Sequence, residues 1–257
     1  MDTDKGQDGV VDIRSRLVAR DFKPEGEKYR GDVFAAMPPL EAKRILFAMA
    51  AKGKLEQWKG KKQLRKLMFI DVKKAHLNGQ VPEEEAVCIE LPMEAGSPGK
   101  YGLLKRWLYG MRSAASAWER DYTEKLEAVE FVRGKSAPTV FFRSRDGMRC
   151  VVHGDDFTFY GFDDELKEIK RKMEEHYEIK VRAVLSPEPG DDKEITILNR
   201  RLRWKDGRLE YEADPKHVAI LCEAMRLTGD SKGATAAISK EDLMKDKEDG
   251  KKWLRKR

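Results

Sequence analysis

Hydrophobic and polar positions along the chain follow two periods, which predict both strands and helices. Residues 67–72 form an apolar run broken by one acid, Asp71, which is typical of a buried strand that ends at a site. Shorter apolar or alternating runs predict the other strands, and they often lie in pairs around turn residues. These predicted strands cover residues 16–20, 87–91, 101–108, 139–143, 149–152, 157–161, 179–184, 194–204 and 208–213.

Apolar residues at helical spacing predict four helices between these strands. Pro38-Pro39 opens the first, Ser113 and Asp163 are the expected N-caps of the next two, and Asp214-Pro215 starts the fourth. The helices are expected to end near residues 51, 129, 176 and 227. Mixed helices and strands with several hairpins predict an α+β or α/β fold.

Three segments lack the apolar anchors of a core. Residues 1–13 predict a disordered N-terminus, and residues 228–257, which end in KKWLRKR, predict a charged flexible tail. Residues 52–66 are expected to form a basic loop that either tracks a nucleic-acid backbone, with Trp58 free to stack on bases, or is simply solvated. Its basic residues are Lys52, Lys54, Lys59, Lys61, Lys62, Arg65 and Lys66.

Composition narrows the class of protein. The 257 residues include 52 Lys or Arg and 46 Asp or Glu, so the net charge is +6 and an anionic partner is permitted. Charged residues make up 38%, against about 25% in typical domains, which predicts a small core with much solvated surface. Five Trp, ten Phe and seven Tyr argue against a wholly disordered chain.

Other features exclude several classes. The three cysteines are far apart and form no CxxC pair, which argues against a disulfide framework or structural zinc and fits a reducing, cytoplasmic or nuclear compartment. Apolar runs such as residues 45–51 are too short to cross a bilayer, and no apolar stretch opens the chain. We therefore expect neither a membrane partner nor a secretory signal.

Three carboxylates carry the candidate chemistry. Asp155 and Asp156 are neighbours in a predicted hairpin turn, and Asp71 ends a different strand. Like charges held close together repel unless a proton or a cation lies between them, and carboxylate oxygens suit Mg²⁺ or Mn²⁺. Alternatively, Gly-Asp-Asp is only a turn, because these residues are common there.

Six blocks of sequence occur in an order that carries a family resemblance. They are RSRLVARDF at 14–22, Phe34-Ala35 with the helix after it, FIDVKKAHLNGQV at 69–81, WLYGMRSAASAW at 107–118, VVHGDDFTF at 151–159, and ITILNRRLRW with the segment that continues to residue 227. Together they resemble the reverse transcriptase domain of Ty1/copia-type retrotransposon polyproteins.

The resemblance implies a right-hand polymerase, with palm and fingers and an antiparallel palm sheet packed on helices. Residues 14–66 would be fingers-like, and residues 67–227 would be the palm-like core. The implied activity is RNA-directed DNA synthesis, in which two Mg²⁺ (or Mn²⁺) ions assist transfer from a dNTP to a primer 3′-hydroxyl on an RNA or DNA template. Asp71 and Asp155 would bridge the metals, and Asp156 would support them.

The resemblance also implies nucleotide contacts. Arg14, Arg16 and Arg20 match a strand that touches the triphosphate and template, although a solvated strand end remains an alternative. His76 stands where the family has an aromatic residue beside the sugar, or is an ordinary partly buried histidine. The family's Gln and Pro are replaced by Ser113 and Ala115, while Arg112 keeps a positive charge nearby.

Further departures are His153-Gly154 before the acid pair, the long basic segment 52–66, and Asn199 in place of glycine. Nothing in the chain resembles a protease, an integrase, an RNase H or a thumb. A second hypothesis is therefore a degenerate remnant that keeps the fold and binds nucleic acid. A third is an α+β interaction domain whose acids are turn and cap residues.

Overall fold

The computed structural model describes residues 2–4, 13–15, 17–22, 25–26, 33–96, 99–229 and 231. The chain divides into two compact units, residues 1–212 and residues 213–257. Only residues 2–4 and 13 of the expected disordered N-terminus, and 228, 229 and 231 of the expected tail, are described. The division into N-terminus, fingers-like segment, palm-like core and tail stays a prediction.

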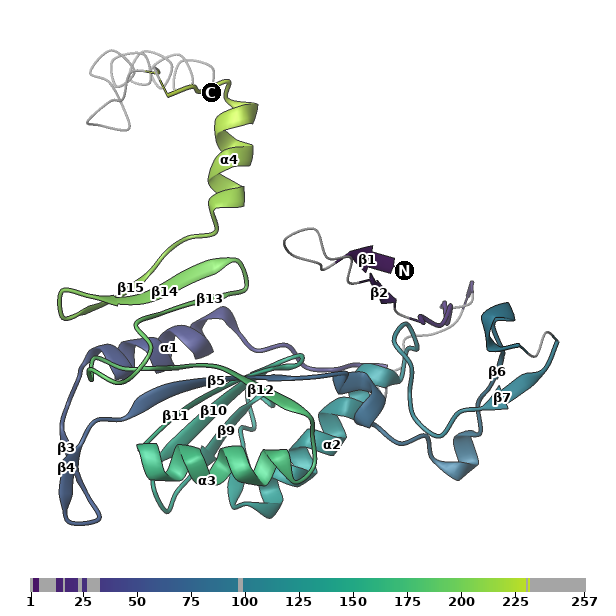
Figure 1. Ribbon diagram of the computed structural model, residues 1–257, viewed down its shortest axis with the longest axis horizontal. Helices are drawn as coiled ribbons and strands as arrows, with labels where there is room; N and C mark the ends of the chain where they lie inside the picture. The colour runs from purple at the N-terminus through teal and green to yellow at the C-terminus, as the bar shows by residue number, and fades with distance from the viewer. Residues whose placement is uncertain are drawn as a thin grey trace, which may run out of the picture. The chain divides into compact units, whose positions relative to one another are not determined.

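The first unit is built around a six-stranded antiparallel sheet of order β12-β5-β11-β10-β9-β8, with helices on both faces (Figure 1). This mixture of helices and antiparallel strands confirms the α+β class. The strands are β5 (Lys66–Val72), β8 (Phe131–Arg133), β9 (Val140–Arg143), β10 (Met148–His153), β11 (Asp156–Gly161) and β12 (Ile179–Leu185).

Alternation along β5 divides the core into two layers. Met68, Ile70 and Val72 pack with α2 (Ala114–Ala128) and α3 (Asp163–Glu174) on one face. Leu67 and Phe69 pack with α1 (Leu40–Ala51) on the other. Asp71 has the same parity as Leu67 and Phe69, so it lies on the face that α1 covers.

A three-stranded sheet completes the α1 face. It contains β13 (Glu194–Ile197), β14 (Arg200–Lys205) and β15 (Arg208–Tyr211). The prediction of one strand over 194–204 is wrong, because Leu198 and Asn199 form a two-residue turn with φ of 47° and 60°. Asn tolerates this left-handed conformation, which hairpin turns require.

The segment predicted as a basic loop contains a hairpin, so that prediction is also wrong. β3 (Glu56–Trp58) pairs with β4 (Lys61–Gln63), and Lys59-Gly60 form the turn with positive φ at both residues. Two further hairpins pair β6 (Cys88–Glu90) with β7 (Tyr101–Leu103) and β1 (Asp2–Asp4) with β2 (Ile13–Ser15). β7 is the strand predicted over residues 101–108, and it ends earlier than predicted, at Leu103.

The predicted helix starts had mixed outcomes. In the second unit, Asp214 accepts a hydrogen bond from the Lys216 amide at 2.9 Å and caps α4 (Pro215–Ala224), as expected. Ser113 precedes α2 without a side-chain cap, and Asp163 is the first residue of α3 rather than its N-cap. Short 3-10 turns cover Ala75–Asn78, Glu83–Glu85 and Met93–Ala95.

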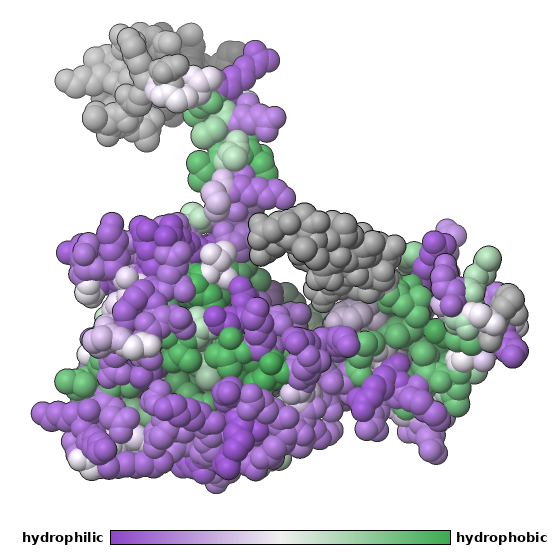
Figure 2. All heavy atoms as spheres, viewed as in Figure 1, coloured by the Kyte–Doolittle hydropathy of each residue, from purple (hydrophilic) through white to green (hydrophobic). Residues whose placement is uncertain are grey.

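The hydrophilic surface and the free cysteines agree with what the composition predicts, which is much solvated surface and no disulfide framework. Figure 2 shows hydrophilic side chains over most of the visible face of the molecule. All three cysteines are free thiols, and Cys150 is buried. Within the described ranges, no helix combines the length and apolar character needed to cross a bilayer.

Candidate active site

Strand register brings the candidate carboxylates to one end of the sheet. β11 is antiparallel to β5, and Asp156 lies directly opposite Asp71. Asp155 occupies the two-residue turn between β10 and β11, and its carbonyl accepts a hydrogen bond from the Val72 amide at 2.9 Å. Acids far apart in the sequence are therefore neighbours because two strands pair in this register.

The turn that carries Asp155 is held from the helix side as well. Gly154 has a φ of 64°, a conformation that favours glycine at this first turn position. Its carbonyl accepts a hydrogen bond of 2.9 Å from the indole Nε1 of Trp118, which is only 2% exposed. Trp118 meets Tyr177 and Tyr122 edge-on. Trp118 is therefore a core residue that also anchors the turn.

Electrostatics at this end of the sheet favour a cation. Burial raises the pKa of the Asp71 carboxyl, and the nearby charges of Asp155 and Asp156 raise it further. The same repulsion would be relieved by a positive charge between the carboxylates. A divalent metal ion bound between the carboxylates would supply this positive charge.

Asp156 already has internal cations. Arg182 of β12 donates from Nη1 to its Oδ1 at 3.3 Å and from Nη2 to the Thr196 carbonyl at 2.6 Å. Lys43 of α1 is 7% exposed; burial lowers its pKa, and Asp156 is the main charge that opposes this shift. The third carboxylate therefore faces two positive groups.

Asp71 and Asp155 line an open cavity of about 590 Å³. Its other lining residues are Val72, Lys73, Lys74, Tyr109 and Glu178. The Lys73 ammonium pairs with Glu178 at 2.5 Å, and Lys74 adopts a left-handed φ of 55°. Carboxylates next to lysines suit a ligand that combines a metal ion with phosphate oxygens.

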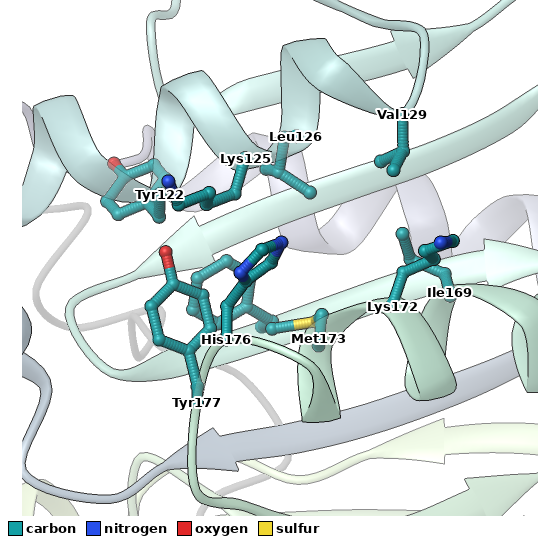
Figure 3. Close-up of a pocket in the computed structure, with 10 residues that line it drawn as sticks. Tyr122, Lys125, Leu126, Val129, Ile169, Lys172, Met173, His176 and Tyr177 are labelled. Atoms are coloured by element: carbon teal, nitrogen blue, oxygen red, sulfur yellow. The ribbon is translucent and has the colours of Figure 1, made fainter.

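A second cavity, between α2 and α3, holds no comparable chemistry. Figure 3 shows its lining, in which Tyr122, Leu126, Ile169 and Met173 surround a narrow space. Its volume is about 20 Å³, roughly enough for one water molecule. It is a packing gap of the helix face.

The donors at the acid cluster fit Mg²⁺ or Mn²⁺ in chemistry, but they do not all converge. Among the residues that the structure describes, no three His, Cys, Asp or Glu side chains are grouped closely enough to hold a metal ion. Asp71 and Asp155 share a cavity, whereas Asp156 is paired with Arg182. Two of the three predicted ligands therefore face the space that a metal would enter.

The predicted nucleotide contacts are only partly assembled. His76 stacks at a tilt on Tyr109, with ring centroids 4.9 Å apart, and burial lowers its pKa although Asp155 opposes the shift. Arg20 and Ser113 line a different cavity, and the Arg112 amide donates to Asp21 at 3.0 Å. The side chain of Arg14 and the whole of Arg16 lie outside the described residues.

A close backbone approach links the cavity lined by Arg20 and Ser113 to the cavity lined by Asp71 and Asp155. The Ala19 amide donates to the Tyr109 carbonyl at 2.8 Å. Gly110 has a φ of 86°, and a Cβ there would lie 2.2 Å from the Ala19 carbonyl oxygen. Gly110 is therefore required for the segment that carries Arg20 to lie beside Tyr109.

Three of the predicted nucleic-acid-binding cations have internal partners. Lys59 pairs with Asp164 and Glu165, Arg65 with Glu56, and Lys66 with Glu188 and Asp191. The other four cations, Lys52, Lys54, Lys61 and Lys62, are exposed. Contact of these four with a nucleic-acid backbone stays a prediction.

Trp58 is not free to stack on bases, contrary to the expectation. Its ring stacks on Phe162 with centroids 4.7 Å apart, and its Nε1 donates to Asp164. The indole thus fastens the β3–β4 hairpin to the start of α3.

Four cations of the site were missed from the sequence. Lys73 and Lys74 follow Asp71 directly, and that adjacency was an available signal. Lys43 shares the apolar face of α1 with buried Leu46 and Phe47, so a charge on an apolar stripe was a second signal. No sequence signal marks Arg182, because a strand irregularity places it.

Two comparisons with known proteins show which family the chain resembles in sequence. A family model described as "Reverse transcriptase (RNA-dependent DNA polymerase)" matches residues 2–190. The chain is 22% identical over 178 residues to the "Retrovirus-related Pol polyprotein from transposon TNT 1-94" of Nicotiana tabacum. That match covers 66% of this chain and 12% of the relative, so the chain spans a small part of that polyprotein's length. The chain therefore belongs to the reverse transcriptase family, and it is a domain of the copia-type retrotransposon Pol kind.

Proposed function

We propose that the chain is an RNA-directed DNA polymerase that transfers nucleotides from dNTPs to a primer 3′-hydroxyl on an RNA or DNA template. The observation that carries this proposal is the meeting of Asp71 and Asp155 at one cavity, at the ends of paired strands. Family membership supports it, because this family is described as an RNA-dependent DNA polymerase.

The proposed right-hand arrangement assigns the six-stranded sheet with α2 and α3 to the palm. The segment before β5, with the β3–β4 hairpin, would belong to the fingers. An antiparallel sheet covered by two helices on one face, with acids at one end, supports this assignment.

In this proposal Asp71 and Asp155 hold Mg²⁺ or Mn²⁺, which would activate the primer hydroxyl and stabilise the leaving pyrophosphate. Lys73 and Lys74 hold phosphate oxygens of the dNTP beside the carboxylates. Neutral His76, packed on Tyr109, lies close enough to Asp155 to interact with it electrostatically and would border the sugar.

Primer extension with Mg²⁺ tests the proposal. Asp155→Asn keeps the turn but removes a charge, so we expect the extension rate to fall by at least about 100-fold. Asp206→Asn is the matched control, because Asp206 lies in the β14–β15 turn with a φ of 49° that Asn also tolerates. An unchanged rate for Asp155→Asn would contradict the proposed site.

The second candidate is a degenerate remnant that binds nucleic acid without synthesis. The pairing of Asp156 with Arg182 favours it, because one of the three predicted carboxylates is engaged by an internal cation. It predicts duplex binding that weakens steeply with salt, and no extension at any Mg²⁺ or Mn²⁺ concentration. Extension that Asp155→Asn abolishes would exclude this candidate.

A further inference from the structure

Arg182 reaches Asp156 because β12 is irregular at that point. The strand pairs with β5 through Ile179, Lys180 and Val181, and its register then shifts between Val181 and Ala183. Arg182 is the extra residue of this bulge, and bulges redirect side chains relative to a regular strand. The redirected guanidinium crosses β5 to the acid on β11.

Two hydrogen bonds fix the guanidinium between separate sheets. Nη1 donates to the Asp156 carboxylate at 3.3 Å, and Nη2 donates to the Thr196 carbonyl of β13 at 2.6 Å. Because the Thr196 carbonyl already holds the planar guanidinium, Arg182 loses little further freedom when it binds the Asp156 carboxylate. The contact to Asp156 is therefore preorganised by the fold.

Lys43 is a second positive charge that acts on Asp156. It lies on the buried face of α1, and Asp156 and Arg182 are both among the charges that act on it. Asp156 is the acid that acts most strongly on the Lys43 ammonium, and Lys43 is only 7% exposed.

We propose that Arg182, backed by Lys43, is a built-in counter-ion that holds Asp156 out of metal coordination and so weakens the affinity of the site for divalent cations. Arg182 is thus a positioning residue that acts through Asp156. The proposal rests on the proposed function, because it takes Asp71 and Asp155 as the metal ligands. Its physical basis is that divalent-metal affinity depends strongly on the number of charged ligands.

A titration of the full chain with Mn²⁺ alone, with free Mn²⁺ measured by EPR, tests this inference. We expect Arg182→Gln to tighten Mn²⁺ binding by about tenfold, because it releases one carboxylate and removes a competing charge. Lys43→Met should tighten it by roughly threefold, because Arg182 is among the charges that act on Asp71 and Lys43 is not. Arg203→Gln is the control: Arg203 is similarly exposed, 27% against 33%, and pairs with Glu210 and Glu212.

A second substitution separates this role from an ordinary supporting contact. Asp156→Asn alone should weaken Mn²⁺ binding only about two- to threefold, because it removes a nearby negative charge but no ligand, and it should cancel most of the gain when combined with Arg182→Gln. Weaker Mn²⁺ binding in Arg182→Gln would mean that Arg182 orients Asp156 as a ligand, and would overturn the proposal. Unchanged binding in both Arg182→Gln and Lys43→Met would also overturn it.

Failure of this inference is distinguishable from failure of the proposed function. Wild-type Mn²⁺ binding that Asp71→Asn abolishes shows that the site exists, whatever Arg182 does. Absence of such binding would instead reject the metal site itself. Should Arg182→Gln fail to fold by circular dichroism, Lys43→Met and Asp156→Asn still decide the outcome.

Discussion

Trp118→Phe tests whether the indole hydrogen bond stabilises the turn that carries Asp155. The substitution keeps an aromatic ring between Tyr122 and Tyr177 but removes the Nε1–H that donates to Gly154 at 2.9 Å. We expect a lower free energy of unfolding and a looser turn.

The magnitude follows from two losses. The hydrogen bond is partly exposed, so its removal should cost about 0.5–1.5 kcal/mol. Shortening a ring that is 2% exposed leaves a small void, which adds about 1–2 kcal/mol. Together these predict a destabilisation of about 1.5–3.5 kcal/mol.

Trp107→Phe is the matched control. Trp107 is 3% exposed, and its buried Nε1 has no hydrogen-bond partner. Its replacement leaves a similar void but removes an unsatisfied donor, so we expect a change within about 1 kcal/mol. The difference between the two variants therefore contains the lost contact to Gly154 and the relief of the unsatisfied Trp107 donor.

Urea unfolding followed by circular dichroism measures the free energies, and hydrogen exchange at the Val72 amide reports on the turn. That amide donates to the Asp155 carbonyl, so its protection should fall in Trp118→Phe and not in Trp107→Phe. Equal destabilisation by the two variants, with unchanged Val72 exchange, would refute the reasoning.

Three further predictions follow from the charges. The pKa of Asp71 is raised in the folded chain, so its ionised form opposes folding. Asp71→Asn should therefore raise the melting temperature at pH 7 without metal. This gain should vanish below the ordinary Asp pKa of 3.8, because Asp71 is then protonated in both the folded and the unfolded chain. Lys66→Met should lower the free energy of unfolding by about 3 kcal/mol in urea, because it leaves the carboxylates of Glu188 and Asp191 without the cation that neutralises them. The control Lys167→Met breaks an exposed pair and should lower it by less than about 0.5 kcal/mol. If the exposed hairpin lysines contact phosphates, Lys61→Ala and Lys62→Ala should each reduce the salt slope of duplex binding by about one, measured by fluorescence anisotropy, and an unchanged slope would assign them to solvent.

The sequence by itself determined the features that depend on neighbouring residues. The apolar run before Asp71, the Gly-Asp turn before Asp156 and the Asp214 cap all follow from local periodicity and turn chemistry. Local patterns failed where a turn was hidden inside a polar or alternating stretch, as at Lys59-Gly60 and Leu198-Asn199.

Only the tertiary structure decided which groups meet. Pairing of β5 with β11 set Asp71 opposite Asp156, and the bulge in β12 turned Arg182 toward the same acid. Packing of α2 brought Trp118 to Gly154. Lys59 and Lys66, which the sequence left available for nucleic acid, form ion pairs with Glu165 and Asp191. Register, bulges and ion-pair partners depend on contacts between distant segments, whose energies no single stretch of sequence contains.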